Sequence, residues 1–119
     1  METYGKKVWF IPDAFYNSQW NGQVSHEAVC VINTTDTDAN IKFTFFFEDA
    51  DKLEGFTSFC KAGRTHHSRM DRLRNEKGEG IVKDKPYAIM LESDVPLIAQ
   101  YSRLDTSQSE MALMTTIPY

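Results

Sequence analysis

The feature that most restricts the fold of this chain is an alternation of apolar and polar side chains with a period of two. In the stretch IKFTFFFED, alternate positions are apolar on one side of an extended strand (Ile41, Phe43, Phe45 and Phe47) and polar on the other (Lys42, Thr44 and Glu48). Successive side chains of a strand point to opposite faces, so this pattern predicts a strand with one buried face.

Other stretches of the chain are also rich in β-branched and aromatic residues and are separated by turn signals. The predicted strands are KVWFI, EAVCVIN, IKFTFFFED, GFTSFCK, RTHHSRM, PYAIMLESD, PLIAQYSRLD and MALMTTIPY, and the predicted turns include Pro12-Asp13, Ala62-Gly63 and SDVP. EAVCVIN is almost continuously apolar, which is typical of a strand covered on both faces. About seven or eight strands predict an all-β, antiparallel sandwich or barrel, forming one domain over residues 1–119.

Charge and hydropathy narrow the choice of partner and compartment. The formal net charge of −4 makes the whole molecule repel phosphate backbones, which disfavours nucleic acid. Residues 61–77 hold six of the 13 Lys and Arg residues, so weak nucleic-acid binding there remains an alternative, although no aromatic side chain is interleaved with that charge. No apolar run is long enough for a membrane helix and no signal peptide is recognisable, so we expect a cytoplasmic location.

Metal binding and catalysis find little support in the spacing of reactive residues. His66 and His67 are adjacent and would point to opposite faces of a strand, so they cannot bind one ion together. The sequence contains no GxSxG, HExxH or CxxC motif. Cys30 and Cys60 fall inside predicted strands, where we expect reduced thiols that act as small apolar side chains. We therefore expect no metal, no cofactor and no enzymatic activity.

Polar side chains inside otherwise apolar strands are the main candidates for a site. Glu92 lies in IMLESD, and Gln100 and Arg103 lie in IAQYSRLD. One of three arginines, Arg103, Arg64 or Arg69, could meet Glu92 or Glu48 across a sheet and form a partly buried ion pair. Such a pair fits either a contact that fixes strand register or an oligomer interface, or the lining of a pocket for a hydroxyl-rich or anionic small molecule. The residues alone leave both open.

Several motifs resemble, in the same order, those of the Anabaena sensory rhodopsin transducer family. They are GKKVWFIPD, SHEAVCVIN, FFFED, RTHHSRMDRL, ESDVPLIAQYSRLD and ALMTTIPY, and the resemblance extends from Gly5 to Tyr119. It implies a β-sandwich of jelly-roll type that assembles as a cyclic tetramer and has no enzymatic activity. The founding role in that family is as a cytoplasmic partner of a membrane photoreceptor, and a wider role as a sensor of small, sugar-like molecules has been proposed.

We therefore predict a non-catalytic signalling module with a polar ligand site. Its expected residues are His26, Glu27, His67, Arg69, Glu92, Gln100 and Arg103. Strand pleating would place His67 and Arg69 on one face and Arg64 on the other. An interaction adaptor without a small ligand is the alternative, and so is a polar cluster that only locks an oligomer. Four apolar residues on otherwise polar faces also favour a homo-oligomer: Phe46, Phe59, Met90 and Met114.

Overall fold

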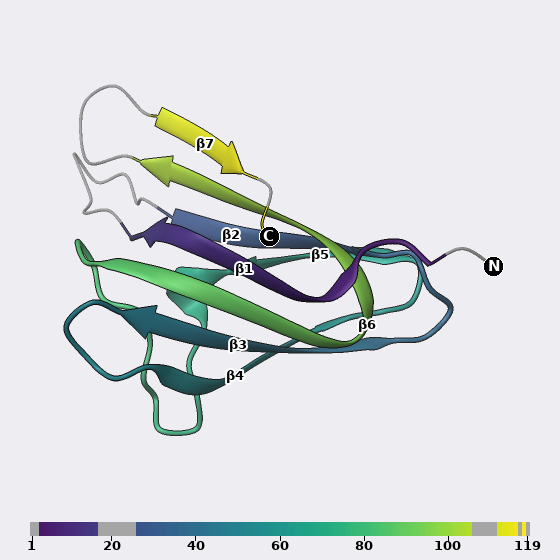
Figure 1. Cartoon of the computed structure of the whole chain (residues 1–119), viewed down its shortest axis with the longest axis horizontal. Coiled ribbons are helices and arrows are strands. Elements are labelled where there is room, and N and C mark those ends of the chain that lie inside the picture. The colour runs from purple at the N-terminus through teal and green to yellow at the C-terminus, as the bar shows by residue number, and fades with distance from the viewer. Residues whose placement is uncertain (1–2, 17–25, 106–111, 117, 119) are drawn as a thin grey trace.

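The computed structural model describes residues 3–16, 26–105, 112–116 and 118, and strands are the main elements of this part of the chain. Its elements are β1 (Lys6–Phe15), β2 (His26–Asn33), β3 (Ala39–Phe47), β4 (Leu53–Cys60), β5 (Arg64–Arg69), the 3₁₀ turn η1 (Met70–Arg72), β6 (Pro86–Asp105) and β7 (Ala112–Thr116) (Figure 1). All six strand pairings are antiparallel. The prediction of an all-β, antiparallel fold is confirmed, whereas the jelly-roll topology stays a prediction.

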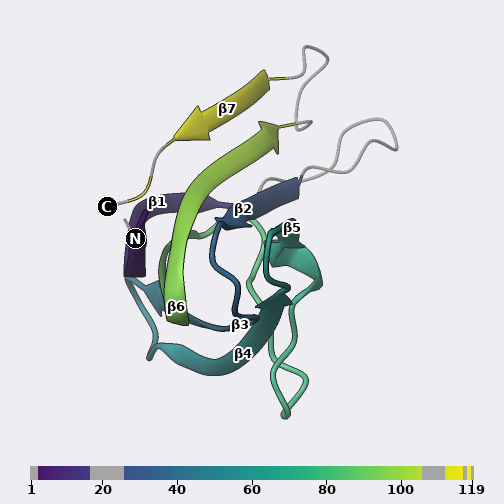
Figure 2. The same ribbon diagram turned by 90° about the vertical axis from the view of Figure 1, so that its right-hand side faces the viewer.

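Strand β6 belongs to both halves of the sheet. Its first part pairs with β1 and β3, and its second part pairs with β2 and β7. Because β4 pairs with β3 and β5 pairs with β2, each half extends outward from this shared strand. Figure 2 shows β6 curving from one half into the other, so that the sheet curls into a half-barrel around its own interior.

The prediction of a turn at SDVP is wrong, because β6 bends there without reversing direction. Ser93 is still in register with β3, whereas Leu97 is in register with the beginning of β1. Pro96 lies between these two ladders, at an irregularity of the kind that tolerates a residue without an amide hydrogen. Asp94 joins the bend to β3 by accepting hydrogen bonds from the backbone N and Nδ2 of Asn40, both at 2.9 Å.

The predicted turn at Pro12-Asp13 is also wrong, because β1 continues through it to Phe15. The register with β6 shifts between Ile11 and Ala14, which marks a bulge. In a regular strand, side chains three positions apart point to opposite faces. The bulge instead lets Ile11 and Ala14 both be buried, while Pro12 and Asp13 remain exposed.

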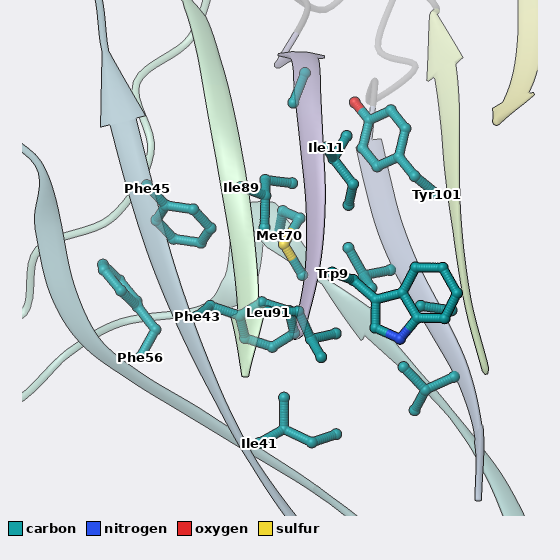
Figure 3. Packing of buried hydrophobic residues seen from close by; sticks show 14 of the residues in the cluster. Trp9, Ile11, Ile41, Phe43, Phe45, Phe56, Met70, Ile89, Leu91 and Tyr101 are labelled. Atoms are coloured by element: carbon teal, nitrogen blue, oxygen red, sulfur yellow. The ribbon is translucent and has the colours of Figure 1, made fainter. Parts of the chain in front are cut away.

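The core fills the space between the two halves (Figure 3). Phe43 and Phe45 of β3 are buried as the alternation predicted, and the Phe45 ring lies 4.5 Å from Phe56 and 5.7 Å from Tyr87, measured between ring centroids. Trp9 is 9% exposed and its indole N–H donates to the carbonyl oxygen of Leu97 at 3.0 Å. These aromatic contacts connect β1, β3, β4 and β6.

Strand β2 is covered on one face only, contrary to the prediction from its apolar sequence. Val29 and Val31 point into the core, but Cys30 is half-buried on the outer face and Ile32 is 48% exposed. Both cysteines are free thiols, and Cys60 is buried as expected. The apolar outer residues of β2 therefore contribute to a surface of the single chain.

Candidate functional site

The structure separates the seven predicted site residues. Glu92 lies apart from the rest, exposed on the outer face of the half that contains β1 and β3, where it is in register with Val8 and Lys42. It therefore does not meet Arg69 or Arg103, which lie in the other half. The remaining six residues all lie on β2, β5 and the second part of β6.

Two of the six, His67 and Gln100, line the same hollow on the outer face of these three strands. Cys30 of β2 is in register with His67 of β5 on one side and with Gln100 of β6 on the other. Side chains at such aligned positions stand next to one another on the same face. The hollow has a volume of about 460 Å³ and is also lined by Trp9, Val31, Ile32, Thr65, Ile98 and Ala99. We call it the outer groove.

The outer groove combines apolar walls with free polar groups. Ile32 and Ile98 are 48% and 40% exposed. His67 and Gln100 are exposed and make no hydrogen bond or ion pair with any other described residue, so their donors and acceptors can serve a ligand. Burial raises the pKa of the Cys30 thiol, which keeps it protonated and a poor nucleophile. The groove is suited to binding rather than to covalent chemistry.

A second polar feature lies inside the half-barrel, where Glu27 is almost completely buried, with 1% of its surface exposed. Its carboxylate accepts hydrogen bonds from the hydroxyl of Tyr87 at 2.6 Å, from the backbone N–H of Phe15 at 3.0 Å, and from the hydroxyl of Tyr101. We call these four residues the Glu27 cluster. Arg103 is in register with Glu27 on the neighbouring strand.

The electrostatics of the Glu27 cluster are dominated by burial. Burial raises the pKa of Glu27 above its usual value of 4.5, although hydrogen bonds from Tyr101, Tyr87 and Phe15 and the charge of Arg103 act in the opposite direction. Burial and the neighbouring Glu27 charge also raise the pKa of both tyrosines. Both hydroxyl groups therefore keep their protons and act as donors.

A residue outside the set of predicted site residues holds Arg69 in place. The Nε and Nη2 atoms of Arg69 donate to Oδ1 and Oδ2 of Asp71 at 2.8 and 2.7 Å. Burial raises the pKa of the Asp71 carboxyl, but the hydrogen bonds and charge of Arg69 outweigh burial and leave the pKa below its usual value of 3.8. His26 also lowers this pKa through its charge. The sequence contained a local signal for this ion pair, because Asp71 follows Arg69 by only two residues.

The cations of the basic stretch 61–77 lie in different surroundings. Besides Arg69, Arg74 is engaged by its own chain, since its Nη1 donates to the carbonyl oxygens of Asp71 at 2.9 Å and Leu73 at 2.7 Å. Lys61 and Arg64 line a small hollow near Phe59 and His66, whereas Lys77 lines another among acidic residues. The alternation of faces is as predicted, because Arg64 is in register with buried Asn33 whereas His67 and Arg69 share the outer face.

No three or more His, Cys, Asp or Glu side chains in the described parts of the chain are grouped closely enough to hold a metal ion. No helix within the same residues has the length and apolar character needed to cross a membrane.

A sequence model of the Anabaena sensory rhodopsin transducer family matches residues 4–119. This chain belongs to that family. The resemblance seen in the sequence motifs is thus confirmed, and membership in a sensory transducer family indicates a role in signalling, with a receptor or another signalling protein as partner.

Two solved structures are similar to this transducer family member over most of its length. The crystal structure of Thermotoga maritima 1070 has a TM-score of 0.84 and 40% sequence identity, covering 97% of this chain and 94% of that one. The Anabaena sensory rhodopsin transducer has a TM-score of 0.77 and 30% identity, covering 87% of this chain and 92% of that one. A search of curated proteins found no match.

Proposed function

We propose that this chain is a non-catalytic, cytoplasmic signalling domain that binds a small polar ligand in the outer groove and relays its presence to a protein partner. Family membership supports the signalling part of this proposal. The observation that carries the ligand part is the alignment of His67, Cys30 and Gln100 across three strands, with the imidazole and the carboxamide both free of partners among the described residues.

The lining of the outer groove favours a neutral, hydroxyl-rich ligand over an anionic one. None of the residues that line it carries an Arg, Lys, Asp or Glu side chain. A carboxamide and an imidazole each offer a donor and an acceptor, which suits hydroxyl groups. The indole of Trp9 and the side chains of Ile32 and Ile98 offer apolar contact, and the volume of about 460 Å³ is in the usual range for small-molecule sites.

A thermal-shift screen at fixed protein concentration tests this proposal. The panel should contain neutral sugars, sugar phosphates, carboxylates and nucleotides. A ligand at about 100 times its dissociation constant stabilises a protein by roughly 2.7 kcal/mol, which should raise the melting temperature by several degrees. We expect a neutral sugar-like compound to produce that shift, and we expect His67→Ala and Gln100→Ala to abolish it.

His66→Ala is the matched control for this screen. His66 is also exposed on β5 but does not line the outer groove, so its loss should leave the ligand-induced shift intact. If no compound of the panel raises the melting temperature of the folded wild-type protein, the ligand part of the proposal is wrong. The result would favour an adaptor that recognises only proteins. A shift that survives both groove variants would place the ligand elsewhere on the molecule.

Self-association is a second part of the proposal, with a cyclic tetramer as its expected form. Val8, Phe10 and Phe46 are 40%, 47% and 37% exposed on the outer face of the half that contains β1 and β3. Large apolar side chains gathered on one exposed face are typical of a protein contact. Light scattering should give a molar mass about four times that of the chain, and Phe10→Asp should lower it. Thr34→Asp, in the exposed turn before β3, should not.

A further inference from the structure

The Glu27 cluster joins segments that are far apart in the sequence at one end of the half-barrel. Phe15 is the last residue of β1 and Tyr87 lies at the beginning of β6. Tyr101 lies in the part of β6 that pairs with β2, so the same strand reaches the Glu27 carboxylate twice.

No cation is bonded to the Glu27 carboxylate among the described side chains. Arg103 faces it from the neighbouring strand and acts through its charge without a hydrogen bond or ion pair. From β1 only the backbone N–H of Phe15 reaches the carboxylate. On the other side of Tyr87 lie the uncharged rings of Phe45 and Phe47, while Asp71 of η1 acts on Tyr87 through its charge.

A carboxyl group in this position holds its proton more tightly than one in water. Burial raises the pKa of Glu27 because removing the anion from water costs more than removing the neutral acid, and the three hydrogen bonds and the charge of Arg103 offset only part of that cost. If this end of the half-barrel opened and water reached Glu27, the anion would gain the larger hydration energy. Opening therefore favours loss of the proton, and closure favours its uptake.

We propose that Glu27 is a proton-linked clasp, in which uptake of a proton favours the closed meeting of β1, β2 and both parts of β6, and loss of the proton favours opening and hydration of that end. The clasp requires no ligand and does not depend on the proposed role of the outer groove. As expected for a buried acid, the closed state becomes more stable relative to the open state as the pH falls.

Amide hydrogen exchange at Phe15 measures this equilibrium, because exchange requires the bond from Phe15 N–H to Glu27 to break. After correction for the intrinsic exchange rate, the open fraction should rise severalfold between pH 4 and pH 8. Each unit by which the pKa of Glu27 in the closed state exceeds its value in the open state gives up to a tenfold change. The carboxyl carbon signal of Glu27 should titrate with a midpoint above 4.5.

Three variants make the test specific. Glu27→Gln keeps the shape of the side chain without its charge, so the open fraction should no longer depend on pH. Arg103→Gln removes the cation that favours the Glu27 anion, so the midpoint of the Glu27 titration should move to higher pH. This variant tests the proposal even if Glu27→Gln does not fold. Glu48→Gln, at an exposed glutamate, should behave as the wild type. A Glu27 midpoint below 4.5, a flat open fraction across its titration, or unchanged pH dependence in Glu27→Gln would overturn the proposal.

Discussion

At the scale of single residues, Asn33 shows how one buried amide organises a turn. Its Nδ2 donates to the carbonyl oxygens of Thr37 at 2.8 Å and of Cys60 at 3.1 Å. Its Oδ1 accepts from the backbone N–H and the hydroxyl of Thr35, at 3.0 and 2.7 Å. The side chain, fully buried at the end of β2, thereby fixes the connection to β3 and the end of β4.

Replacing Asn33 by Ala should lower the free energy of unfolding by about 2–3 kcal/mol, because buried carbonyl and amide groups lose their partners. Urea denaturation measures the change, and the slope of the transition should stay the same. Thr34→Ala, at the exposed neighbouring position, should change the stability very little. Equal effects of the two substitutions would show that the buried amide does not organise the turn.

The ion pair between Arg69 and Asp71 gives a prediction about pH. Asp71→Asn should cost about 1–2 kcal/mol near neutral pH, because both charge-assisted hydrogen bonds are weakened. The pKa of Asp71 in the folded protein lies below 3.8, so its stabilising contribution is complete above that pH and is lost as the pH falls through the folded-state pKa. The difference in unfolding free energy between wild type and variant should therefore shrink below about pH 4.

Asp49→Asn is the matched control for this prediction. The pair that Asp49 forms with Lys85 is longer, at 3.3 Å, and the two side chains are 67% and 52% exposed. Exposed pairs of this kind contribute little to stability, so the control should unfold like the wild type across the same pH range. A constant deficit of Asp71→Asn down to pH 2 would contradict a lowered pKa.

Among the elements, two glycines allow the chain to enter or leave a strand with a left-handed backbone conformation. Gly5 precedes β1 with a φ of +83°, and a Cβ atom there would lie 2.1 Å from the carbonyl oxygen of Leu97. Gly63, in the turn between β4 and β5, has a φ of +65° but no atom within 4 Å of the position of its missing Cβ. The two glycines share the left-handed backbone but differ in the space around them.

Gly63→Ala should cost about 1 kcal/mol, which is the strain of a left-handed conformation for a residue with a side chain. Gly5→Ala should cost considerably more, about 3 kcal/mol, because the start of β1 must also move away from β6. Thermal or urea unfolding of the two variants gives the comparison directly. Similar losses at both positions would mean that the close approach of Gly5 to Leu97 is relieved without cost.

The sequence predicted elements well wherever a strand is regular. The alternation around Phe43 places the core face of β3 correctly. Pro12 and Pro96 misled the prediction, because proline marks turns in sequence patterns but here occupies bulges and bends inside long strands. Whether such a proline ends a strand depends on the partners of the strand, which a local pattern does not contain.

The candidate site was only partly predictable for a related reason. His67 and Gln100 were identified because polar residues stood within strands, and their alignment across β2 follows from strand pairing. Glu27 was also identified, but its donors Tyr87 and Tyr101 were not, because their convergence depends on the curl of β6. Glu92 was grouped with these residues because the alternation of polar and apolar residues does not show in which half of the sheet a polar residue lies.

At the scale of the whole molecule, the sharing of β6 implies that the two halves unfold together. Every strand pairing except those of β4 and β5 includes β6 directly. Because β6 is part of both halves, unfolding of one half removes part of the strand on which the other half is built. We therefore expect one cooperative transition, since the halves are joined both by covalent continuity and by a common core.

This expectation can be checked with two probes in a Trp20→Phe background, which leaves Trp9 as the only tryptophan. Trp9 fluorescence reports on β1 and the core, and far-UV circular dichroism reports on all strands. The two unfolding curves should have the same midpoint and the same slope. Separate midpoints would show that the halves are independent units.

The shared strand also has a consequence for how such a chain can change over generations. A substitution in β4 alters the pairing with one neighbouring strand, whereas a substitution in β6 alters the pairing on both sides and, near its bend, in both halves at once. An insertion there would shift the register of several ladders simultaneously. We expect lineages descended from this fold to vary in length in the segment between η1 and β6, and to keep the length of β6 itself nearly constant.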